Sequence, residues 1–302
     1  MLNILRAPAY ATIQDTGRTG FLASGVPRAG AMDLTALLTL NAMLANDAGC
    51  AALEWALSEG EIEFGRATIF AVGGAAGALS LSGRDITPWR AHSATPGDRL
   101  LVGAPDAGRF IYIAVAGGID VPRKLGSRST YVPGGIGGLD GRRLRSGDSI
   151  ATLAPSRRKR HQVTDSLPHD LRPPVRSGTI RFVPRQAIDL RQAWTVSAAS
   201  DRTGYRLESA ELQPGGSVTS EPVCAGVIQL PPDGRPIVLM ADAPTIGGYM
   251  IAGAVMSADL GALAQTPPGE RIVFEPVEVS AAQRALAADA DRVSRVREWS
   301  LA

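Results

Sequence analysis

Residues 110–120 read Phe-Ile-Tyr-Ile-Ala-Val-Ala-Gly-Gly-Ile-Asp. The first six are mostly β-branched or aromatic, and a run of that length and composition is typical of a β-strand. The two glycines that follow allow the chain to turn sharply. The same unit, a short apolar run ended by turn residues, recurs along the chain and predicts a mainly β protein.

Further strand-length runs lie on both sides of this segment. Each is β-rich or alternates apolar and polar residues, and turn sequences such as Pro-Gly-Asp at 96–98 and Pro-Asp-Gly at 232–234 separate them. This punctuation favours antiparallel barrels. The predicted strands cover residues 62–64, 68–72, 78–81, 110–115, 179–183, 236–240 and 271–274.

Few segments have helical character. Asp33 is a suitable N-cap for the apolar run 34–44, which lacks Gly and Pro. A second helix is expected after Ser257, and a third, Ala-rich helix from Ser280 toward Trp299.

The chain divides at residues 155–177, where a basic run and four prolines replace the apolar pattern. We interpret this segment as a linker, and its charges as a solvated surface. The predicted domains are residues 1–154 and 178–302.

Composition excludes several classes of partner. The 302 residues carry a net charge of +2, so no overall field attracts nucleic acid or an anionic membrane. The apolar segments are shorter than the ~18 residues of a membrane span, and the opening residues do not resemble a signal peptide. We therefore expect a cytoplasmic protein that binds a small molecule or another protein.

Cysteine and histidine are scarce. Cys50 and Cys224 share no CxxC spacing, which argues against a disulfide framework or a thiolate metal site and favours two buried, inert thiols. Catalysis by histidine would depend on His92 and lacks a GxSxG motif. No metal site is predicted.

Glycine-rich segments carry the polar residues of the first half. The absence of a Gly-Lys dipeptide excludes a Walker A loop, and the cluster 134–141 does not match GxGxxG. Its backbone could cradle an anion or could form a tight turn. Asp15 and Arg18 lie in a similar segment, where they could line a site or stabilise their own turn.

In the second half a carboxylate, an amide and a phenol follow or precede predicted strands beside glycines. Asp242, Gln229 and Tyr249 could hydrogen-bond a small polar substrate such as an amide or a lactam. A structural role for each residue is the alternative.

Together these segments resemble the allophanate hydrolase subunit 2 family, which includes the C-type subunit of 5-oxoprolinase, the KipA regulators and the carboxyltransferase domain of urea carboxylase. The resemblance implies two cyclophilin-like β-barrel domains and a partner similar to the B-type subunit or to KipI, with the A-type subunit as a further possible partner. The matching stretches are 13–18, 25–27, 30–33, 114–120, 126–130, 137–142, 201–202, 204–207, 228–229, 232–234 and 247–249.

The family's reactions act on an amide nitrogen or carbonyl. Its 5-oxoprolinase members serve the ATP-dependent opening of the 5-oxoproline lactam to glutamate, and its urea carboxylase members move a carboxyl group from carboxybiotin to urea. The resemblance therefore implies ATP use through the complex, and biotin only in the carboxyltransferase alternative. A third alternative is a KipA-like regulator without enzymatic activity.

The resemblance also suggests roles for individual residues. Asp242 would be the acid, base or orienting carboxylate, and Tyr249 and Gln229 would hydrogen-bond the substrate. The other residues expected to bind the substrate or shape its site are Asp15, Arg18, Asp33, Gly135, Gly137, Gly138, Arg206, Gly247 and Gly248.

One motif departs from the family. Many members read Asp-Arg-Gln-Thr-Thr-Gly-Gly-Tyr-Pro where residues 242–250 read Asp-Ala-Pro-Thr-Ile-Gly-Gly-Tyr-Met. The loss of an arginine removes a fixed charge and up to five hydrogen-bond donors. This predicts a changed substrate or a purely regulatory protein as alternatives.

Overall fold

Two compact units make up the fold. A computed structural model describes residues 1–154, 166–174, 178–209, 212 and 217–301. Residue contacts group 1–17, 33–173 and 290–302 into unit 1, and 18–32 and 174–289 into unit 2. Residues 18–32 therefore belong with the second half of the chain.

The domain boundaries at residues 154 and 178 stay a prediction from the sequence. Residues 155–165 and 175–177 of the predicted linker lie outside the described part of the chain. Within the same segment, residues 169–171 form a short 3-10 helix, and Leu167 and Leu171 are buried.

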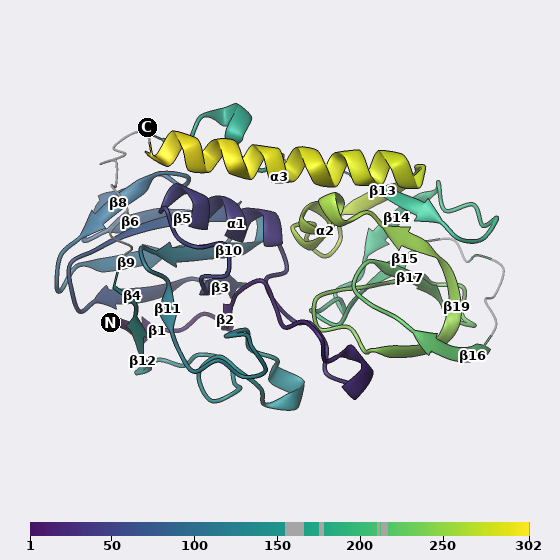
Figure 1. Cartoon of the computed structure of the whole chain (residues 1–302), viewed down its shortest axis with the longest axis horizontal. Helices are drawn as coiled ribbons and strands as arrows, with labels where there is room; N and C mark the ends of the chain where they lie inside the picture. Colours follow the sequence, from purple (N-terminus) through teal and green to yellow (C-terminus); the bar gives the residue numbers. More distant parts are fainter. Residues whose placement is uncertain (155–165, 175–177, 210–211, 213–216, 302) are drawn as a thin grey trace. The chain divides into compact units, whose positions relative to one another are not determined.

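Unit 1 is built from two antiparallel sheets (Figure 1). In the described residues a seven-stranded sheet has the order β11-β12-β1-β4-β9-β6-β7, and a five-stranded sheet has the order β2-β3-β10-β5-β8. The strands are β1 (Leu2–Arg6), β2 (Tyr10–Gln14), β3 (Ala52–Ala56), β4 (Gly60–Phe64), β5 (Thr68–Ala76), β6 (Leu79–Leu81), β7 (Arg84–Asp85), β8 (Ala91–Ala94), β9 (Arg99–Val102), β10 (Ala107–Val115), β11 (Ile119–Asp120) and β12 (Ser149–Thr152).

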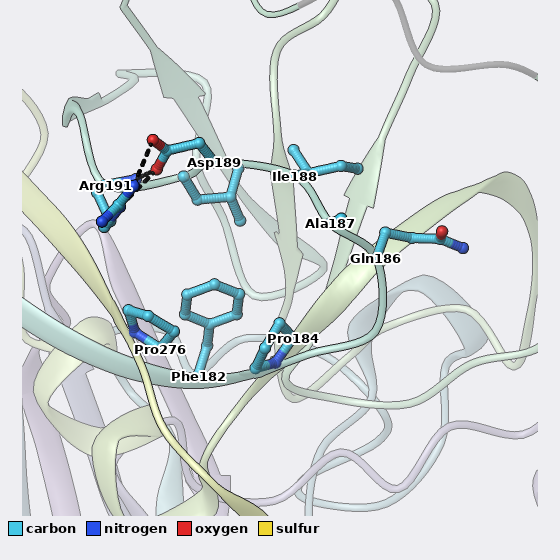
Figure 2. Close-up of a pocket in the computed structure, with 9 residues that line it drawn as sticks. Phe182, Pro184, Gln186, Ala187, Ile188, Asp189, Arg191 and Pro276 are labelled. Atoms are coloured by element: carbon cyan, nitrogen blue, oxygen red, sulfur yellow. Dashed lines mark hydrogen bonds and ion pairs between the residues drawn. The ribbon is translucent and has the colours of Figure 1, made fainter.

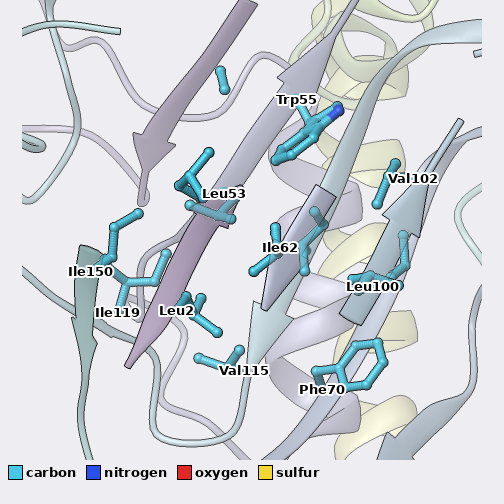
Figure 3. Packing of buried hydrophobic residues seen from close by; sticks show 14 of the residues in the cluster. Leu2, Leu53, Trp55, Ile62, Phe70, Leu100, Val102, Val115, Ile119 and Ile150 are labelled. Atoms are coloured by element: carbon cyan, nitrogen blue, oxygen red, sulfur yellow. The ribbon is translucent and has the colours of Figure 1, made fainter. Parts of the chain in front are cut away.

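The core of unit 1 collects alternate residues from these strands. Residues of β4 and β9 alternate between buried and more accessible positions, as expected for strands with one face on a core. Figure 3 shows the resulting cluster around Trp55, Ile62 and Phe70. Burial of such side chains contributes about 1.5–3 kcal/mol each and is the main stabilising term of the unit.

Helix α1 (Leu34–Met43) contacts β5 and β10. The Asp33 carboxylate accepts a hydrogen bond from the Ala36 amide, which confirms the predicted N-cap. The last part of α3 (Val279–Leu301) contributes Arg292, which donates to the Thr39 hydroxyl on α1. Helix α1 is buried around most of its surface for this reason.

Unit 2 contains a closed barrel (Figure 1). The order β13-β20-β14-β15-β18-β17-β19 returns to β13 through an antiparallel pairing, and β16 pairs with β19 beside the ring. The strands are β13 (Thr179–Pro184), β14 (Ala193–Val196), β15 (Gly204–Glu208), β16 (Ser217–Pro222), β17 (Val227–Leu230), β18 (Ile237–Leu239), β19 (Ile246–Val255) and β20 (Arg271–Pro276).

Helix α2 (Ser257–Ala264) contacts strand β13. Asp259 is fully buried and accepts two hydrogen bonds from the Arg181 guanidinium, at 2.7 and 2.9 Å, and one from the Arg181 amide. A buried carboxylate needs such partners, so this pair anchors α2 to the barrel.

The observed architecture confirms the mainly β prediction, and the three predicted helices are present. The 3-10 helices Leu22–Ser24 and Val132–Gly134 add short turns. Among the described residues no helix is both long and apolar enough to cross a membrane.

Candidate functional site

Asp242 forms a buried ion pair with Arg202 in unit 2. The guanidinium donates from Nε to Oδ2 at 2.9 Å and from Nη2 to Oδ1 at 2.8 Å, and the Asp242 amide donates to the Arg202 carbonyl. The two side chains are 6% and 4% exposed. Both oxygens of Asp242 are thus held in one plane by a partner that remains charged. This geometry suits an orienting carboxylate better than a proton-transfer group.

Arg202 also ties residues 18–32 to the rest of unit 2. Its Nη2 donates to the Gly30 carbonyl at 2.7 Å. Within the same segment the Arg18 amide donates to the Arg28 carbonyl, and the Arg18 side chain is buried. The Arg202 guanidinium therefore joins Asp242 to a backbone segment far away in sequence.

Gln229 on β17 is also buried. It lies in register with Ile237 on β18 and with Ile251 on β19, so its side chain shares a face of the barrel wall with theirs. Gly247 and Tyr249 lie on the same face of β19, because they precede Ile251 by four and two positions. Three predicted site residues, Gln229, Gly247 and Tyr249, therefore share one face of unit 2.

Asp242 is connected to this face through Ala243, the residue that follows it in the sequence. Ala243 belongs to a buried cluster with Val223, Leu239 and Ile251. Among the described residues, however, no hydrogen bond or ion pair joins any two of Asp242, Gln229 and Tyr249. Tyr249 is 40% exposed, unlike the other two. All three residues belong to unit 2, and their role as a catalytic group stays a prediction.

Two further predicted residues of unit 2 lie on strands. The side chain of Arg206 on β15 is exposed, while its backbone pairs with Ile237. An added Cβ at Gly248 on β19 would lie 3.3 Å from the Ser220 hydroxyl, a close contact that requires the hydroxyl to shift by a few tenths of an ångström.

Unit 1 contains the remaining predicted residues, and Asp15 among them is fully engaged within its unit. Its Oδ1 accepts hydrogen bonds from the hydroxyls of Ser127 and Ser129, both at 2.6 Å, and from the Gly17 amide. Its Oδ2 accepts from the Arg128 amide at 2.6 Å. These bonds fix the loop at 127–129 and leave the carboxylate little capacity to bind a substrate.

Asp33 takes part in a series of buried hydrogen bonds that continues through Tyr112 to Glu54. The Tyr112 hydroxyl donates to Glu54 Oε2 and accepts from the Asp33 amide, both at 2.8 Å. Burial raises the pKa of Tyr112 well above its usual value, and the nearby Glu54 carboxylate adds to this shift. Glu54 and Tyr112 are completely buried, and neither was predicted from the sequence.

The glycine cluster forms a tight turn. Gly135, Gly137 and Gly138 have φ values of 61°, 73° and 53°, in the left-handed region that favours glycine. The amides of Gly135, Gly138 and Gly141 donate to carbonyls of their own loop region. These three donors are already used within the loop region, which supports the tight-turn interpretation.

The thiols and His92 differ in their surroundings. Cys50 is partly buried, and this burial raises its pKa, as expected of an inert thiol. Cys224 is exposed, so the prediction that it is buried was wrong.

Burial lowers the pKa of His92, whose Nε2 lies 2.9 Å from the Thr87 carbonyl oxygen. Within the described ranges no three His, Cys, Asp or Glu side chains form a metal-binding group.

A separate pocket of about 320 Å³ opens at the end of β13 in unit 2. Figure 2 shows Phe182, Pro184 and Pro276 on one side and the chain segment 186–191 on the other. Asp189 and Arg191 form an exposed ion pair at its rim, which lowers the pKa of Asp189 to about 2. None of the predicted site residues lines this pocket.

Arg202 is the main residue of the site that was not predicted from the sequence. It lies in the matching stretch 201–202, and arginine is over-represented where a carboxylate is held by two parallel hydrogen bonds. That partner, Asp242, lies 40 positions further along the chain.

This fold and this site define a carboxyltransferase-type protein. Residues 24–276 match the family model of the carboxyltransferase domain, subdomain A and B, so the chain belongs to that family. The family predicted from the sequence is thereby confirmed.

Among its relatives, the chain is similar to the C-type subunit of 5-oxoprolinase from Escherichia coli, with 38% identity over 94% of both chains. It is also similar to urea amidolyase of Lachancea kluyveri, with 30% identity over 91% of this chain and 17% of that protein.

Among solved structures, urea carboxylase of Kluyveromyces lactis superposes with a TM-score of 0.89 at 27% identity. This match covers the whole of the present chain and 29% of that enzyme. The chain thus spans under a third of each urea enzyme but nearly all of the E. coli protein.

Proposed function

We propose that this protein is the counterpart of the C-type subunit in a cytoplasmic, ATP-dependent 5-oxoprolinase. One observation carries the proposal: the chain and the C-type subunit of the E. coli enzyme match over 94% of both lengths. The similarity to urea amidolyase covers only 17% of that larger protein. A match to nearly the whole of one relative and to a small part of the other favours the role of the separate subunit.

In the proposed complex this chain binds the lactam and a partner binds ATP. The glycine turn at 134–141 supports this division, because the amides of Gly135, Gly138 and Gly141 already donate to carbonyls of the loop region. The partner would be similar to the B-type subunit or to KipI, with a counterpart of the A-type subunit as a further component. Opening the lactam then yields glutamate.

Within this chain, Asp242 would orient the substrate or its neighbours, and Gln229 and Tyr249 would hydrogen-bond the amide group. Burial of the Arg202–Asp242 pair supports a fixed, charged anchor beside a mostly apolar wall. Such a site suits an amide or lactam group held by few polar contacts.

Reconstitution tests the proposal. The chain is purified together with its B-type and A-type partners, and ATP hydrolysis is measured with 5-oxoproline, with urea and without an acceptor. We expect hydrolysis to depend on 5-oxoproline.

Two outcomes would favour the rival functions. Carboxyl transfer from carboxybiotin to urea would indicate a carboxyltransferase. Tight binding of a KipI-like partner with no turnover in either assay would indicate a regulator. Either result would contradict the 5-oxoprolinase assignment.

A further inference from the structure

Gly247 has no room for a side chain, and the obstacle is a single group. A Cβ atom at this position would lie 2.2 Å from Nε2 of Gln229. The next contacts, Cδ of Gln229 and Cγ1 of Val223, would be at 3.3 Å. Gly247 does not have the positive φ that favours glycine, so the amide of Gln229, and not the backbone conformation, requires a glycine here.

The nitrogen of the amide that occupies this space has no hydrogen-bond partner in the part of the chain that the structure describes. Gln229 is 4% exposed, and its Nε2 is buried with no acceptor among the described residues. Buried donors in native proteins are nearly always satisfied, so an exception calls for an explanation. A ligand that supplies the acceptor is one such explanation.

The neighbours of the amide define that ligand. Val223 and Ile251 belong to an apolar cluster and carry no side-chain acceptor or charge. A neutral N–H donor in apolar surroundings matches a neutral carbonyl oxygen, whereas a carboxylate would need a cation beside it. Tyr249, two positions along the same face of β19, is 40% exposed and marks the side open to solvent.

We propose that Gly247 is a positioning residue that lets the Gln229 carboxamide stand over strand β19, where Nε2 donates a hydrogen bond to the carbonyl oxygen of the bound amide or lactam. This inference rests on the proposed function and adds the atom that recognises the substrate. Gly247 then determines specificity without touching the substrate.

The substitution Gly247→Ala isolates this arrangement. The new methyl group would displace the end of a flexible side chain rather than backbone, so the fold should persist while the amide moves. The matched control is Gly49→Ala, which lies outside the predicted site and whose Cβ would meet no atom within 4 Å. Gln229→Met removes the amide and keeps the chain length.

Kinetics of the reconstituted complex give the first test. We expect Gly247→Ala and Gln229→Met to raise KM for 5-oxoproline by about tenfold, the loss of one hydrogen bond. Their double variant should lose no more than either alone. Gly49→Ala should stay within about twofold of wild type. Unchanged KM in both single variants, in an active complex, would overturn the inference and leave the proposed function intact.

A spectroscopic test does not depend on ATP hydrolysis. The side-chain NH₂ resonance of Gln229 is assigned in the ¹⁵N-labelled chain, within the complex, by its disappearance in Gln229→Met. Addition of 5-oxoproline should shift this resonance, whereas proline, which has the ring but no lactam carbonyl, should not. An unshifted resonance in the presence of 5-oxoproline would contradict the inference even if the complex were active.

Discussion

The guanidinium of Arg202 holds both carboxylate oxygens of Asp242 inside unit 2, through hydrogen bonds of 2.8 and 2.9 Å. The same guanidinium reaches the Gly30 carbonyl. A charge pair that is almost fully buried is costly to form but much more costly to break on one side. Arg202 is therefore as important to the predicted site as Asp242.

The first prediction concerns the stability of this pair. Arg202→Met leaves the Asp242 carboxylate buried without its partner, and we expect the free energy of unfolding to fall by about 3–5 kcal/mol. Urea unfolding monitored by tryptophan fluorescence measures the change. The exposed pair Asp189–Arg191 provides the control, because Asp189→Asn should leave the unfolding midpoint unchanged. Equal effects of the two substitutions would contradict the structural importance of the buried pair.

The second prediction separates two roles of Asp242. We expect Asp242→Asn to lower the turnover of the complex by about 100-fold. If Asp242 acts by orientation, Arg202→Lys should lower turnover to a similar degree, because a lysine cannot make the paired contact. Steady-state kinetics on the folded variants decides. A large loss in Asp242→Asn with normal turnover in Arg202→Lys would instead identify Asp242 as the proton-transfer group.

The third prediction concerns Asp15 and the loop at 127–129. Because its carboxylate accepts four hydrogen bonds, Asp15→Ala should destabilise unit 1 by about 2–4 kcal/mol. Hydrogen exchange should show earlier loss of protection at the Arg128 amide. The comparison is Asp120→Asn, which removes one partly exposed contact to Arg128 and should have a small effect. Full protection of that amide in Asp15→Ala would refute this account.

The fourth prediction concerns pH and Tyr112. Its pKa is raised above 10 in the folded protein, so folding holds the phenol neutral while the unfolded chain ionises. The stability from Tyr112 is therefore complete below pH about 10 and falls as the pH rises further. Tyr112→Phe should cost about 1–3 kcal/mol near neutral pH, because Glu54 and the Asp33 amide lose their partner.

The difference between wild type and Tyr112→Phe should accordingly narrow above pH about 10. Urea unfolding from neutral to alkaline pH measures it, with Tyr249→Phe as the exposed control. A difference that stays constant across this range would show that Tyr112 is not held neutral by the fold.

Local sequence predicted the three helices, and all seven predicted strand runs fall on strands, but the structure contains further strands that were not predicted. The run at 110–115 lies within β10, and the Asp33 cap begins α1 as expected. These elements depend on alternation, β-branched residues and capping, which act over a few positions. Pairing over long distances was not predictable in the same way. Strand β19 pairs with β13 and so closes the barrel of unit 2, but no local sequence pattern indicates this pairing.

The site shows the same limit. Asp15 was selected as a polar residue among glycines, but its partners Ser127 and Ser129 lie more than a hundred positions away, so the sequence did not indicate these hydrogen bonds. Arg202 was not selected, because its importance comes from Asp242. Gln229 and Gly247 were both predicted, yet only the structure shows that the space of one is filled by the amide of the other.

The most direct test of the proposed function is the amount of glutamate formed from 5-oxoproline by the reconstituted complex, with this chain present and with it omitted. We predict ATP-dependent formation of glutamate only when the chain is present. Equal formation of glutamate without it, or none with all partners present, would contradict the assignment.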